Sequence, residues 1–174
     1  MEEPNFSNGD CRRCPVTDRM TAKENLLLLI NESTKLGAMA ACLYIVVEGE
    51  DPGFDTFVNG HALARNEETL ERLAMALHVN PLLEFFSADE NSMSLLLEQG
   101  TGNPEWARNL PEPQWFAPTD GLETVRALVG FLTLKPAAIG SETFPVLLEL
   151  REYERVLTKT ADRGLRWHLA ASWS

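Results

Sequence analysis

The chain has 174 residues, enough for one domain with a real hydrophobic core. Its content of 44% hydrophobic and 24% charged residues excludes a disordered chain, a collagen and a disulfide-dense miniprotein. The net charge of -11, from 26 acidic and 15 basic residues, argues against a nucleic-acid binder that neutralises phosphates.

The sequence contains no sign of export or membrane insertion. No stretch approaches the roughly 20 consecutive apolar residues that span a bilayer. The acidic start, Met1-Glu2-Glu3, lacks the basic and apolar regions of a secretory signal. We therefore expect a cytoplasmic protein with no membrane contact, whose cysteines are reduced thiols.

The first 38 residues differ in composition from the rest of the chain. Residues 1–20 predict a flexible tail, and a capping box of Thr21 and Glu24 predicts a short helix over 21–33. We expect residues 39–174 to form a single compact domain. Residues 1–38 are then an appendage or translated leader, unless helix 21–33 docks on the sheet and belongs to the core.

The strongest strand pattern follows at 41–48, where a continuous apolar run predicts a central strand covered on both faces. A turn-rich acidic loop follows at 48–55. Apolar residues at helical spacing then predict one amphipathic helix over 62–78 and a short helical turn at 82–86.

The second half of the chain predicts two more helices and a final strand. One helix is expected from about residue 120 to Lys135, and the next from Thr143 to Gly164. Alternation over 165–173 predicts a half-buried strand with an edge or a water-facing side, and 92–98 is compatible with another strand. The sum is a small α/β or α+β domain in which a few-stranded sheet packs against three or four helices.

The acidic excess is concentrated in the middle of the chain. Residues 39–117 carry thirteen acidic and three basic side chains, whereas residues 118–174 carry seven of each. If the acidic segments, which extend over 48–90, share one face, that face attracts a basic partner; the alternative is a solvated surface. The candidate partner-binding residues are Glu50, Asp51, Asp55, Glu67, Glu68 and Glu71.

Two aromatic residues, Trp115 and Phe116, lie in a proline-rich loop over 100–118. They either anchor this loop to the core or extend the partner-binding surface as an exposed aromatic patch.

Residue patterns that support catalysis are weak. Cys11 and Cys14 have redox or zinc spacing, but two further ligands are missing, so no metal is predicted. The chain has no serine-nucleophile motif, phosphate-binding loop or calcium-binding loop, and no cofactor is predicted.

One alternative site depends on how the strands pair. If the first and last strands are neighbours, Tyr44, Glu48, Arg166 and His168 line one open face, where a general base, an anion clamp and a carboxylate would meet. His61, after the Asn-Gly turn at 59–60, is a further candidate for this site. The sequence therefore favours a non-enzymatic interaction protein with a basic partner, with a small enzyme or small-molecule binder around His168 and Arg166 as the alternative.

Overall fold

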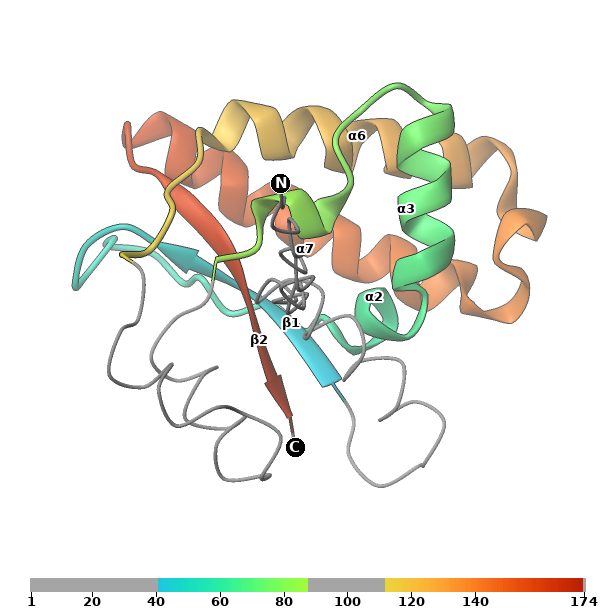
Figure 1. Ribbon diagram of the computed structural model, residues 1–174, viewed down its shortest axis with the longest axis horizontal. Helices are drawn as coiled ribbons and strands as arrows, with labels where there is room; N and C mark the ends of the chain where they lie inside the picture. Colours follow the sequence, from blue (N-terminus) through green and yellow to red (C-terminus); the bar gives the residue numbers. More distant parts are fainter. Residues whose placement is uncertain (1–40, 88–111, 174) are drawn as a thin grey trace, which may run out of the picture.

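Two strands from opposite ends of the described chain form an antiparallel sheet, and helices pack against it (Figure 1). The computed structural model describes residues 41–87 and 112–173. This small α+β domain confirms the predicted fold class. Its strands and α-helices are β1 (Ala41–Val47), α2 (His61–Arg65), α3 (Glu67–Ala76), α6 (Pro118–Leu134), α7 (Thr143–Asp162) and β2 (Trp167–Trp173).

The two faces of β1 differ in burial. Leu43 pairs with Ala171 and Ile45 with Leu169, and all four are buried in the core. The alternate positions of β1, such as Tyr44, are only half-buried. The prediction that β1 is covered on both faces is therefore wrong. Both faces of β1 carry apolar residues, but only one of them faces the core.

The strand β2 is more deeply buried than its alternating pattern predicts. Every residue from Trp167 to Ala171 is buried. The reason is that β2 has neighbours along both edges: β1 lies on one side, and on the other Phe116 bridges to Trp167 while Phe86 bridges to Leu169. The expectation of an exposed edge or an open face here is wrong, because a sequence does not show which strand gains a second neighbour.

The helices α6 and α7 form an antiparallel pair along the core (Figure 1). Their apolar stripes follow the predicted helical spacing and are buried. The helix α6 begins at Pro118, earlier than predicted, because proline suits the first turn of a helix. After α7, Gly164 adopts a left-handed φ of 65°, as its position predicts.

The helix predicted over 62–78 is divided in two at Asn66. The side-chain Nδ2 of Asn66 donates to the carbonyl oxygen of Ala62 at 2.9 Å. Such a bond competes with the helical backbone pattern. The helix α3 then ends at Ala76, just before His78 takes a left-handed φ of 59°. This side-chain hydrogen bond thus divides the helix, although the hydrophobic pattern of the sequence continues through Asn66.

Three short 3₁₀ turns complete the described fold. The turn Leu82–Phe85 is the predicted one, and Pro136–Ala138 and Gly140–Glu142, between α6 and α7, were not predicted. The predicted tail and helix at 1–38, the strand at 92–98 and most of the loop at 100–118 lie outside the described residues.

Candidate functional site

The acidic residues of the described chain fall into two separated groups. Figure 1 shows the loop after β1, residues 48–55, on one side of the molecule and α3 on the opposite side. We call the first group the acidic loop. The carboxylates therefore form two surfaces, and a partner that contacts one of them does not reach the other without covering much of the molecule.

Guanidinium groups of α7 and its C-terminal end hold the backbone of the acidic loop and the residues after it. Arg163 donates to the carbonyl oxygen of Pro52 at 2.8 Å. Arg155 donates to the carbonyl oxygens of Asp55 at 3.0 Å and Phe57 at 3.2 Å. The Asp55 carboxylate also accepts the N–H of Phe57 at 2.9 Å. These bonds fix the path of the segment without using up its charges.

The carboxylates of the acidic loop differ in their partners. Glu48 forms an ion pair with Arg166, with Nε and Oε2 at 2.9 Å, and this hydrogen bond holds the pKa of Glu48 below its usual range. Within residues 41–87 and 112–173, no ion pair involves Glu50, Asp51 or Asp55. These three side chains are exposed and keep their charge available to a partner.

The second acidic group stands at the start of α3. Glu67 and Glu68 occupy its first turn, and Glu71 follows. Negative charge at a helix N-terminus interacts favourably with the helix dipole. Stabilisation of α3 therefore accounts for the charges of Glu67 and Glu68, so these two carboxylates do not by themselves indicate a binding surface.

Both predicted aromatic residues contact the folded body. The ring of Trp115 lies 4.8 Å from that of His168, and Phe116 meets Phe85 edge-on at 5.4 Å. The backbone N–H of Phe116 also donates to Trp167 at 2.8 Å. These contacts favour the anchoring alternative over an exposed patch.

The predicted alternative site is only partly assembled. Because β1 and β2 pair, Tyr44, Glu48, Arg166 and His168 lie on one face of the sheet, as expected. However, His168 is only 1% exposed, so the expectation of an open face is wrong at this residue. The aromatic ring of Trp115 covers the imidazole, which the strand pattern alone does not reveal.

His61 lies apart from the other three candidates. Its Nδ1 is 2.9 Å from the carbonyl oxygen of Ala41, at the beginning of β1, whereas His168 pairs with Val46 near the other end. Five residues along a strand correspond to about 17 Å. The two imidazoles therefore do not share a site.

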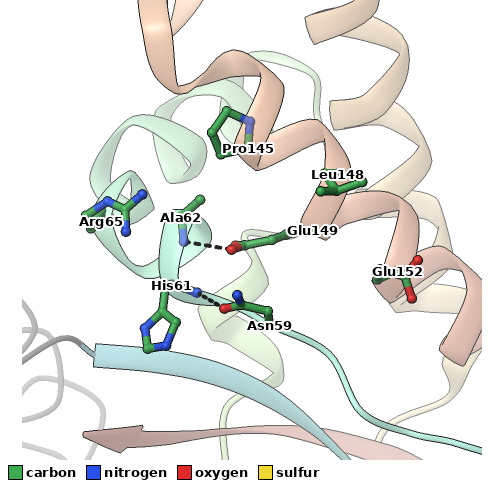
Figure 2. A pocket seen from close by; sticks show the side chains of 8 residues that line it. All are labelled: Asn59, His61, Ala62, Arg65, Pro145, Leu148, Glu149 and Glu152. Atoms are coloured by element: carbon green, nitrogen blue, oxygen red, sulfur yellow. Dashed lines mark hydrogen bonds between the residues drawn. The ribbon is translucent and has the colours of Figure 1, made fainter. Parts of the chain in front are cut away.

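A cavity of about 540 Å³ lies between α2 and α7, and Figure 2 shows the side chains that line it. Glu149 points at the start of α2, where its two oxygens accept the N–H groups of Ala62 at 3.0 Å and Leu63 at 2.8 Å. Burial raises the pKa of Glu149, although these hydrogen bonds favour its charged form. Glu149 was not among the residues predicted from the sequence; its signal there is a carboxylate within the apolar stripe of a helix.

The other polar groups of this cavity are engaged within the fold. Arg65 pairs with Glu142 at 2.8 Å, and Glu152 pairs with Arg155 at 2.8 Å. Figure 2 shows the His61 ring directed toward β1 and away from the carboxylates. Among the described residues that line this cavity, Glu149 therefore joins α2 to α7, and Arg65 and Glu152 are engaged in ion pairs.

A second cavity, of about 560 Å³, lies beside β1, and we call it the β1 cavity. The thiol of Cys42 lines it, and burial raises the pKa of this thiol, so the reactive thiolate is disfavoured. Tyr44 and Asp55 of its lining were both candidate residues from the sequence, but they were assigned to different sites. The lining residues are Cys42, Tyr44, Ile45, Asp55, Thr56, Phe57, Val58 and Ser172.

Comparison with known proteins gives no further guide, since no family model, curated protein or solved structure matches this chain. Among the described residues, no three His, Cys, Asp or Glu side chains are grouped so that they could hold a metal ion. None of the described helices has the length and apolarity required to cross a membrane.

Proposed function

We propose that the protein is a non-enzymatic, cytoplasmic interaction protein that binds a basic protein partner through its acidic loop. The observation that carries this proposal is the exposure of Glu50, Asp51 and Asp55 on a backbone that Arg155 and Arg163 hold in place. A pre-organised loop loses little conformational entropy on binding, and its charges steer a cationic partner toward it.

The acidic loop has more support as the binding surface than α3 does. The carboxylates at the start of α3 have a structural role at the helix N-terminus. Trp115 and Phe116 are held against β2 and the turn Leu82–Phe85, so we leave them out of the proposed surface.

The alternative, an enzyme or small-molecule binder around His168 and Arg166, has less support. The buried imidazole of His168 has no access to a substrate in solution, and the Arg166 guanidinium is engaged by Glu48. A general base and an anion clamp must both reach the same substrate.

Capture of partners from a lysate of the source organism, with the tagged full-length chain, tests the proposal. The variant Glu50→Lys/Asp51→Lys reverses two charges on the acidic loop, and Glu68→Lys/Glu71→Lys makes the same change on α3. We expect the first variant to lose a basic protein that the wild type retains at low salt and releases at high salt. The α3 variant should retain it.

Two results would contradict the proposal. If the loop variant retains the same basic proteins as the wild type, the acidic loop is not the binding surface. If both variants lose them equally, net charge and not a specific surface governs retention.

A further inference from the structure

The β1 cavity lies between β1 and the segment 55–58, just before the chain reaches β1 at Gly60. The N–H of Leu43 donates to the carbonyl oxygen of Gly60 at 3.3 Å, which brings the chain against β1 there. Before Gly60, Arg155 holds Asp55 and Phe57 through their carbonyl oxygens from α7. The resulting cavity of about 560 Å³ is within the size range of ligand pockets.

The lining of the β1 cavity combines apolar walls with a single charge. Ile45 and Val58 are apolar, and Phe57 is 76% exposed although its backbone is held at both its N–H and its carbonyl oxygen. Among the described residues of the lining, Asp55 is the one that is charged, and none is cationic. A large exposed aromatic ring beside a pocket is typical of a binding site.

The guanidinium group that holds the lining backbone is paired with a carboxylate outside the cavity lining. Arg155, which bonds to the backbone at Asp55, forms its own ion pair with Glu152 at 2.8 Å. The Asp55 carboxylate itself forms no ion pair within the described chain. The electrostatic field of the rest of the protein, with its net charge of -11, also attracts cations.

We infer that the β1 cavity binds an ammonium or guanidinium group carried on an apolar stem. Asp55 supplies the countercharge, the Phe57 ring supplies a cation–π contact, and the half-buried ring of Tyr44 contributes apolar surface for the stem. The inference rests on the proposed function in one respect: a basic partner would supply this group as a Lys or Arg side chain. A free organic amine is the other source of the same chemistry.

Titration of the ¹⁵N-labelled full-length chain, followed by amide NMR, tests the inference. The probes are N-acetyl-lysine-N-methylamide, n-butylammonium and the uncharged N-acetyl-norleucine-N-methylamide. We expect the cationic probes to shift amides at 42–45, 55–58 and Ser172, and the norleucine derivative to bind about tenfold more weakly or not at all.

Two variants distinguish the contribution of Asp55 in the cavity from that of the other charges of the acidic loop. Asp55→Asn keeps the acceptor for the Phe57 N–H but removes the charge, and it should weaken the cationic probes about tenfold. Glu50→Gln/Asp51→Asn, which lies outside the cavity lining, should change their affinity by less than about twofold.

The probes also distinguish the source of the cation. Tighter binding of the lysine derivative than of n-butylammonium supports a partner side chain, and equal binding supports a free amine. Absence of shifts with both cationic probes, or equal binding of the norleucine derivative, overturns the inference. Loss of captured partners in Glu50→Lys/Asp51→Lys without cation-dependent shifts would reject the cavity alone and leave the proposed function standing.

Discussion

At the scale of single residues, two carboxylates on neighbouring turns of α7 have different roles. Glu149 is 8% exposed and accepts two backbone N–H groups of α2, a helix that has no side-chain cap of its own. Glu152, three residues later, is half-buried and pairs with Arg155. The first carboxylate satisfies buried donors, whereas the second adds a surface ion pair.

This difference predicts unequal costs of truncation. Glu149→Ala leaves the N–H groups of Ala62 and Leu63 without their acceptor and should lower the free energy of unfolding by about 2–4 kcal/mol. The control, Glu152→Ala, should cost less than about 1 kcal/mol. Urea denaturation measures both. Equal costs would show that Glu149 does not act as the cap of α2.

The pH dependence of stability gives a second prediction for Glu149. Because burial raises its folded-state pKa above the ordinary value of 4.5, the folded state binds this proton more tightly than the unfolded state does. The contribution of protonated Glu149 to the free energy of unfolding is fully present below pH 4.5 and is lost as the pH rises through the raised pKa. The wild type should therefore lose stability relative to Glu149→Gln as the pH increases from about 4.5 to 7.

Urea titrations of both proteins across this pH range measure the difference. The exposed carboxylates of Glu48 and Glu142, whose pKa values are lowered by Arg166 and Arg65, act in the opposite direction. They are present in both proteins, so their contribution cancels. Parallel pH profiles would refute the raised pKa of Glu149.

At the scale of elements, the contact of the 59–60 turn with β1 depends on a glycine. A Cβ at Gly60 would overlap the carbonyl oxygen of Leu43 and approach the Tyr153 hydroxyl to 2.8 Å. That hydroxyl donates to the same carbonyl oxygen at 2.7 Å from inside the core. The glycine is required here for close approach of two backbones and not for an unusual φ.

Gly60→Ala should therefore destabilise the fold by more than about 3 kcal/mol, because backbone and a buried hydroxyl must both move. The matched control is Gly130→Ala in α6, where an added Cβ meets nothing within 4 Å. This control should stabilise the protein by about 0.5–1 kcal/mol through helix propensity. Thermal unfolding compares the two, and a small effect at Gly60 would contradict the close contact.

The elements also differ in how far the sequence predicts them. The helices α6 and α7 follow from apolar spacing and from proline and glycine at their ends, since those signals are local. The break at Asn66 does not follow, because it depends on a side-chain bond to Ala62 and on Glu142 from a distant segment at 3.5 Å.

At the scale of the whole molecule, the fold joins the ends of its described chain. The register pairs Ala41 with Trp173 and Val47 with Trp167. Trp167 also packs against α6, where a Cβ at Gly121 would overlap its ring. Such non-local pairing makes the core dependent on the last strand.

A chain that ends at Gly164 should therefore fail to fold. The loss of Trp167, Leu169 and Ala171 from the core is comparable in free energy to the roughly 5–15 kcal/mol of stability that a domain has. Circular dichroism should show no cooperative thermal transition for this chain. Full-length Arg166→Ala, which removes only an exposed ion pair, should keep a transition within about 1 kcal/mol of the wild type. A cooperative transition in the truncated chain would contradict the requirement for β2.

The candidate site shows the same division between local and non-local information. Asp55 and Tyr44 were identifiable from the sequence by charge and residue type, but their common place in the β1 cavity was not. Phe57 carried no distinctive sequence pattern, and Glu149 only that of a carboxylate within an apolar helical stripe, because exposure of the first and burial of the second depend on packing between segments.

The sequence by itself determined a small domain of α/β or α+β class, the two long helices and the concentration of acidic residues, because periodicity, capping and charge depend on residues close together in the chain. Only the tertiary structure decided that β2 has neighbours along both edges and that β1 keeps one half-buried face. It also buried His168 under Trp115 and separated the acidic loop from α3. Burial and proximity depend on which distant segments meet, and no local pattern encodes that.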